Sequence, residues 1–161
     1  MDLIFCSNDG HRSVCLLDKA IKVIEADIAK YHPLETGGIL IGYYDKNLRN
    51  AVVEIALPAP PDSKHGKNFF ERGIEGISEN LIKIKQASGK LHYIGEWHSH
   101  PNSLPIASQT DKWQMQKFAL RRLYGAQTPL LLIIGGSLPN SLDWKFSLHR
   151  RLKFPITMKL L

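Results

Sequence analysis

The sequence predicts an α/β domain in which a mixed β-sheet is flanked by helices. Its 161 residues, 43% of them hydrophobic, suffice for one well-buried core and are too few for two, so we expect a single domain over residues 1–161. Segments with a hydrophobic period of two residues occur beside segments with helical periodicity. Their order is two strands, a helix, two strands, a helix, a strand, a helix and further strands, which does not fit strict βαβ alternation.

The N-terminal third predicts a hairpin, a helix and two strands. Strands over 3–6 and 12–16 flank an Asp9-Gly10 turn, and the expected register places Cys6 opposite Ser13, which argues against a disulfide between Cys6 and Cys15. The next segments are a helix over 18–32 with Asp18 as its N-cap, ended by Pro33, and strands over 37–45 and 50–57.

The remaining elements follow a stretch rich in proline, glycine and polar residues over 58–68, which could be a functional flap or a passive connection. Ile74, Ile77, Leu81 and Ile84 predict a second helix. A third helix starts at Ser108, and its expected buried stripe includes Met115 and Leu123. The expected strands are 90–100, 128–136 with both faces covered, 142–148, and 154–160 with one buried face.

Charge and hydropathy exclude some classes of function. The net charge is +6 and the pI about 9.4, but the basic residues are scattered, and the small clusters at 121–122 and 149–153 lack an aromatic stacking pattern. A solvated basic surface is therefore favoured over nucleic-acid binding. No apolar run approaches the roughly 20 residues of a membrane span, and the acidic start does not resemble a secretory signal, so we expect a cytoplasmic protein.

The stretch "EWHSHPNSLPIASQTD", residues 96–111, carries the clearest chemical signal. Residues two apart on a strand point the same way, so His98 and His100 would present their imidazoles on one face. Asp111 would lie near the start of the following helix, on the same side as Ser108. Two imidazoles and a carboxylate are the three protein ligands of hydrolytic zinc sites, which keep a fourth position open.

Each part of this pattern also has a purely structural interpretation. A lone His-x-His is common by chance, and Ser108 with Asp111 could simply cap a helix. Together, the parts favour a metal site. A general base is also required, and two glutamates compete for the role: Glu96, on the same strand face as the histidines, and Glu35, before "TGGILIG". Spacing alone favours Glu96, although it could instead orient a histidine.

These residues resemble a known family. The pattern H-x-H, seven residues, S-x-x-D resembles the JAMM signature of the MPN-plus metalloproteases, or JAB domains, and "LETGGILIGYY" resembles that family's second marker. The resemblance spans residues from about 17 to about 150 and implies an MPN/JAB fold, which is cytidine-deaminase-like. It also implies Zn²⁺ bound by His98, His100 and Asp111, Glu35 as general base and acid, and Ser108 as a donor to the oxyanion. Glu96 then keeps a supporting or substrate-facing role.

The resemblance also implies a substrate class. Family members hydrolyse the bond after the C-terminus of ubiquitin or ubiquitin-like proteins, and this chain looks most similar to the prokaryotic subgroup that includes the deconjugating peptidase of CBASS anti-phage operons. That peptidase reverses conjugation of a cyclic-nucleotide synthase. We expect an extended tail held along an exposed strand edge, with the segment after Pro58 as one wall. The alternatives are processing of a small sulfur-carrier protein, a non-catalytic MPN scaffold, and a nucleic-acid-associated JAB-like protein.

Overall fold

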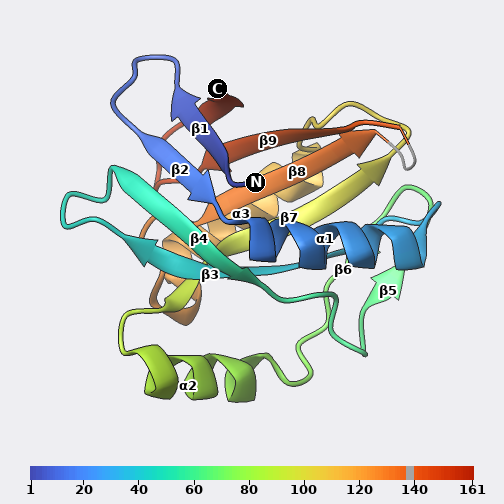
Figure 1. The fold of residues 1–161 in the computed structure, drawn as a ribbon, viewed down its shortest axis with the longest axis horizontal. Coiled ribbons are helices and arrows are strands. Elements are labelled where there is room, and N and C mark those ends of the chain that lie inside the picture. Colours follow the sequence, from blue (N-terminus) through green and yellow to red (C-terminus); the bar gives the residue numbers. More distant parts are fainter. Residues whose placement is uncertain (137–139) are drawn as a thin grey trace.

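Eight strands form one closed barrel, in a computed structural model that describes residues 1–136 and 140–161 (Figure 1). Around the barrel the strand order is β1-β10-β9-β8-β7-β3-β4-β2. The barrel strands are β1 (Leu3–Ser7), β2 (Ser13–Leu16), β3 (Gly37–Tyr44), β4 (Asn50–Ala56), β7 (His92–Pro101), β8 (Leu130–Gly136), β9 (Leu142–Leu148) and β10 (Ile156–Leu160). The other elements are α1 (Asp18–Tyr31), α2 (Ile77–Ser88), α3 (Gln109–Arg121), a 3₁₀ turn η1 (Leu123–Gly125) and a small hairpin of β5 (Lys64–His65) and β6 (Phe70–Glu71).

The sheet is mixed, as the element order predicts. Neighbouring strands are antiparallel except β2 with β4 and β7 with β8, which are parallel. Closure into a barrel is not foreseen from the sequence, because it depends on pairing β1 with both β2 and the distant β10. In the β1–β2 hairpin, Cys6 pairs with Ser13 and Ile4 pairs with Cys15, which confirms the predicted register. Both cysteines are free.

Alternate residues of the central strands serve two cores. Leu130, Leu132 and Ile134 of β8 pack in the main cluster with α1, whereas Leu131 and Ile133 pack on the other face against α3. In β3, Leu40 likewise packs in the main cluster, whereas its neighbours Ile39 and Ile41 pack against α2. Figure 1 shows α1 in front of the strands and α3 behind them. The prediction that residues 128–136 form a strand covered on both faces is confirmed in position and burial.

Four local predictions are wrong. Leu123, expected in the buried stripe of the third helix, lies after α3 in the 3₁₀ turn η1 and is only partly buried. The N-cap of α1 is Leu17 rather than Asp18, whose amide is bound by the carboxylate of Asp2 instead. Ile74 lies outside α2 and is 71% exposed, because the helix begins only after Gly76, which has a positive φ of 76°. In the last segment the strand starts at Ile156 and only Met158 is buried, so the alternation that included Phe154 overstates the buried face.

One further finding concerns membranes: among the residues described, no helix is long and apolar enough to cross a bilayer.

Candidate active site

His98 and His100 lie at the end of β7, where the chain turns toward α3. Both side chains lie on the face of β7 opposite Trp97, which is buried in the main core. Parallel pairing of β7 with β8 continues through Pro101, so the two histidines are fixed by a regular ladder up to the strand end. The expectation that residues two apart would share a face is met here: both histidines line one cleft.

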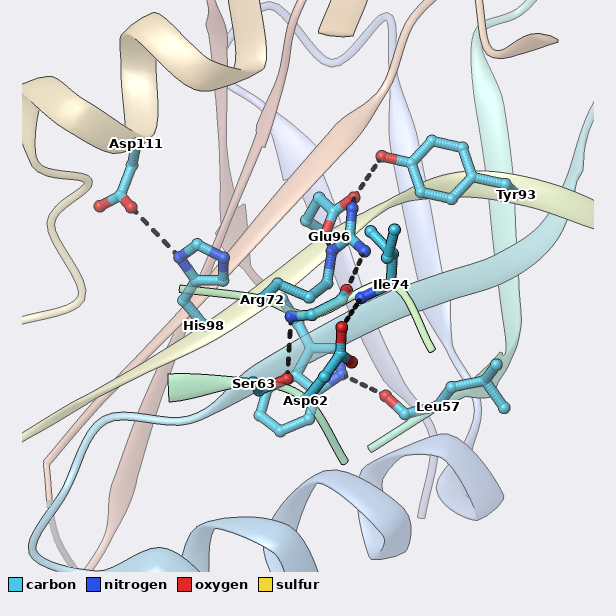
Figure 2. Close-up of polar contacts among 11 residues, drawn as sticks. Leu57, Asp62, Ser63, Arg72, Ile74, Tyr93, Glu96, His98 and Asp111 are labelled. Atoms are coloured by element: carbon cyan, nitrogen blue, oxygen red, sulfur yellow. Dashed lines mark hydrogen bonds and ion pairs between the residues drawn. The ribbon is translucent and has the colours of Figure 1, made fainter. Parts of the chain in front are cut away.

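Asp111 reaches the histidines from the first turn of α3. Its Oδ1 lies 3.1 Å from Nδ1 of His98 (Figure 2). Its Oδ2 lies 3.6 Å from Nε2 of His100. Burial alone would raise the pKa of the Asp111 carboxyl, but hydrogen bonds from His98 and Ser108 hold it well below its usual range. Asp111 is therefore a carboxylate next to two imidazoles.

Ser108 is the N-cap of α3 and forms a capping box with Asp111. The amide of Asp111 donates to Oγ of Ser108 at 3.1 Å, while the amide and hydroxyl of Ser108 both donate to Oδ2 of Asp111 at 2.7 Å. The structural interpretation of "SQTD" as a helix start is thus confirmed, and the same bonds aim the Asp111 carboxylate at the histidines. Ser108 also lines the cleft, with its hydroxyl directed to Asp111.

Glu35 enters the same cleft from the segment before β3. Gly37 pairs with His98, and Thr36 O accepts from Ser99 N at 2.8 Å, which places Glu35 beside the two histidines. Burial raises the pKa of the Glu35 carboxyl to about 7, and the nearby Asp111 charge adds to this, against the opposing effect of His98. A carboxyl with a pKa near neutrality can both accept and return a proton.

The glycine pair after Glu35 allows β3 to approach β7 closely. A Cβ at Gly37 would lie 2.4 Å from Trp97 O, 2.7 Å from a ring carbon of Phe70 and 2.8 Å from Cδ2 of His98. Phe70 packs edge-on against the His98 ring, with 5.4 Å between ring centroids. Position 37 therefore has no room for a side chain.

The cleft has a volume of about 710 Å³. One wall comes from the β5–β6 hairpin and the other from the turn after β7. The segment 58–68, predicted as one wall of the groove, contributes Asn68 to this cleft. Its first part, Pro58 to Pro61, lines a separate small pocket instead. The barrel is closed, and the two-stranded β5–β6 sheet lies beside the cleft. The lining residues on the two walls are Asn68, Phe69, Phe70, Asn102, Ser103, Leu104 and Ile106.

Glu96 lies on the same face of β7 as the histidines but outside the cleft. Its carboxylate is held by Arg72, with Nε 2.6 Å from Oε2, and by the hydroxyl of Tyr93, 2.7 Å from Oε1. Figure 2 draws this cluster and the His98–Asp111 pair as two separate sets of contacts. Glu96 is 2% exposed, so a substrate-facing role is wrong. Its partner Arg72 carries no periodic or motif signal in the sequence, and sequence reasoning missed it.

The ligand types of His98, His100 and Asp111 fit a zinc ion, although their side chains do not form a preformed metal site. Within the described ranges 1–136 and 140–161, no group of three His, Cys, Asp or Glu has the arrangement of a formed metal site. Two imidazoles and a carboxylate are side chains that zinc binds in proteins. The contacts of Asp111, Oδ1 at 3.1 Å from His98 and Oδ2 at 3.6 Å from His100, bring these three groups together. The pKa of His100 is lowered, chiefly by burial, which favours the neutral imidazole that binds metals.

A family model described as "Prokaryotic homologs of the JAB domain" matches residues 18–147. The chain belongs to the prokaryotic JAB family. A CD-NTase/cGAS isopeptidase of Enterobacter hormaechei subsp. hoffmannii is 31% identical over 158 residues, which cover 98% of this chain and 87% of the relative. A probable metalloprotease of Sinorhizobium fredii is 27% identical, covering 83% of this chain and 84% of the relative.

The structural comparison agrees with the JAB fold. The solution structure of a Desulfitobacterium hafniense protein superposes with a TM-score of 0.60 at 23% identity, covering 89% of this chain and 88% of that one. The predicted fold class and the predicted similarity to deconjugating peptidases of the prokaryotic JAB subgroup are therefore confirmed. The roles of individual residues rest on the geometry above.

Proposed function

We propose that this JAB protein is a zinc-dependent isopeptidase that releases a protein conjugated through its extended C-terminal tail. The observation that carries the proposal is the meeting of Glu35 and the set His98, His100 and Asp111 in one cleft. These groups come from three separate segments of the chain. A structural role for any one of them would not require all four to share a cavity.

The proposed chemistry assigns a step to each side chain. His98, His100 and Asp111 would hold the zinc ion, which when bound polarises the scissile carbonyl and makes water more acidic. Glu35 takes a proton from the attacking water and later gives it to the departing lysine amine. Ser108 donates a hydrogen bond to the developing oxyanion once its hydroxyl turns from Asp111. Because water is the nucleophile, the reaction needs no covalent enzyme intermediate.

The relatives named CD-NTase/cGAS isopeptidase support a narrower proposal for the substrate. We propose that the conjugated protein is a cyclic-nucleotide synthase, and that the enzyme acts in the bacterial cytoplasm as part of anti-phage defence. The cleft, with a volume of about 710 Å³, is open between the β5–β6 hairpin and the turn after β7, which suits a flexible C-terminus better than a folded surface.

The test compares two fusion substrates with the purified, zinc-loaded protein. In one, the C-terminal carboxyl group of a cyclic-nucleotide synthase tail is fused through an isopeptide bond to a lysine of green fluorescent protein, and in the other the tail of a sulfur-carrier protein is fused in the same way. We expect cleavage of the first fusion directly after the tail, lost on adding a chelator and restored by zinc. Cleavage of the second fusion alone would overturn the substrate proposal, and cleavage of neither would overturn the isopeptidase proposal.

A further inference from the structure

Behind Glu35 lies a buried polar cluster that the proposed chemistry does not use. The hydroxyl of Thr36 donates to Oδ2 of Asp27 at 2.7 Å. The amide of Thr36 donates to Oγ of Ser99 at 3.0 Å, and Thr36 O accepts from both the amide and the hydroxyl of Ser99, at 2.8 and 3.3 Å. Thr36 is fully buried, and Ser99 and Asp27 are 2% and 6% exposed.

This cluster connects the segments that build the cleft. Ser99 lies between the two histidines on β7, and Thr36 directly follows Glu35. Asp27 belongs to α1, and its Oδ2 also accepts from the amide of Ala59, at the start of the segment that leads to the β5–β6 hairpin, at 3.3 Å. The hydrogen bonds between Thr36 and Ser99 therefore fix the distance between the Glu35 backbone and the strand that carries His98 and His100.

A second pair of contacts holds the other side of Glu35. Its amide donates to Gly66 O at 2.8 Å, and its carbonyl oxygen lies 3.0 Å from Nδ1 of His65, in the β5–β6 hairpin. His65 in turn stacks on Tyr31 at the end of α1, with 3.7 Å between ring centroids. Helix α1 thus contacts both residues that flank Glu35 in space: Asp27 binds Thr36, and Tyr31 stacks on His65.

Stability alone does not explain a carboxyl side chain at position 27. Burying a polar group is costly unless it is hydrogen-bonded, and well-packed apolar residues often serve a core equally well or better. Asp27 is 6% exposed, and the bonds that it accepts from Thr36 and Ala59 are directional. We infer that Asp27 and Thr36 are positioning residues for Glu35, holding its carboxylate in register with the two histidines; the inference rests on the proposed role of Glu35 as general base.

The test uses a matched pair of substitutions at position 36. Thr36→Val keeps the branched shape and removes the hydroxyl, whereas Thr36→Ser keeps the hydroxyl. Misplacement of a reacting group by about 1 Å can cost on the order of 100-fold in rate. We therefore expect Thr36→Val to lower kcat roughly 10- to 100-fold on the cyclic-nucleotide synthase tail fusion. KM and zinc content should stay within about twofold of the native values, and Thr36→Ser should restore most of the rate.

A second variant and a structural readout keep the outcome decisive. Asp27→Leu should reproduce the kcat loss, and crystal structures of both variants should show the Glu35 carboxylate displaced relative to His98. A lower melting temperature with native kcat would mean a purely structural role and would overturn the inference. If the native protein cleaves neither fusion, the isopeptidase proposal fails, and the Glu35 displacement in the crystals still decides the positioning role.

Discussion

The guanidinium of Arg72 and the carboxylate of Glu96 form a buried two-point ion pair, with Nε 2.6 Å from Oε2 and Nη2 3.2 Å from Oε1. The side chains are 7% and 2% exposed. Burial raises the pKa of Glu96, and the adjacent Arg72 acts in the opposite direction. The pair ties the end of the β5–β6 hairpin, whose Phe70 packs on His98, to the strand that carries the histidines.

Removing one partner of this pair should destabilise the fold strongly. Arg72→Leu leaves the Glu96 carboxylate without its counter-charge, so we expect a loss of about 3–5 kcal/mol in the free energy of unfolding, measured by urea denaturation. Lys64→Ala breaks an ion pair with Glu71 in the same hairpin, where both side chains are 68% exposed. That control should cost about 0–1 kcal/mol. Equal losses in the two variants would contradict the importance of the buried pair.

Gly37→Ala should damage the site directly. The added methyl group would collide with the backbone of Trp97 and with the His98 ring, so β3 and β7 must move apart. We expect a destabilised protein with weaker zinc binding, seen by calorimetric titration of the metal-free form. Gly89→Ala is the control: it has open space but a φ of +71°, and should cost about 1 kcal/mol through backbone strain alone. Native zinc affinity in Gly37→Ala would refute the packing argument.

Glu35 should titrate near pH 7 in the metal-free protein, as followed by carbon NMR of its carboxyl group. Its folded pKa is raised above the ordinary value of 4.5, so the folded state binds the proton more tightly than the unfolded state. The contribution of Glu35 to stability therefore falls as the pH rises from about 4.5 to about 7. Glu35→Gln should remove this fall. Asp111→Asn should lower the Glu35 pKa, because it removes a neighbouring negative charge, and an unchanged value would contradict this.

His149 predicts a second, opposite dependence on pH. Burial lowers the pKa of its imidazole to about 4, and its Nδ1 has no hydrogen-bond partner among the described residues. The unfolded state therefore binds the extra proton more tightly, and stability is lost as the pH falls from about 6.5 toward 4. Replacing His149 with Gln should flatten that part of the stability curve. An unchanged curve for His149→Gln would show that another group is responsible.

The sequence predicts most of the site because its signals are local. The two-residue spacing of His98 and His100 and the cap pattern of Ser108 and Asp111 each follow from one element, and both recur in the structure. The placement of Glu96 on the histidine face was also predicted correctly. The ion pair between Glu96 and Arg72, 24 residues away, is not predicted from the sequence. The path of the segment that carries Arg72 depends on tertiary hydrogen bonds, such as those that the amides of Ile74 and Glu75 donate to Asp62.

The choice of Glu35 as general base came from the family resemblance rather than from spacing. What places it next to His98 is the antiparallel pairing of β3 with β7, a contact between residues more than 60 positions apart. Barrel closure likewise depends on long-range pairing, since β1 pairs with β10, which lies far along the sequence. Long-range pairing of this kind leaves no periodic trace in the sequence, whereas the alternation of buried residues in β9 does.

The most direct test of the central claim is a parallel measurement of zinc content and turnover in the native protein and in Glu35→Gln, with His98→Ala as the control for metal loss. If His98, His100 and Asp111 hold the ion and Glu35 moves the proton, Glu35→Gln will bind one zinc per chain and show no turnover, and His98→Ala will lose the metal. Native turnover in Glu35→Gln, or full zinc occupancy in His98→Ala, would contradict the account.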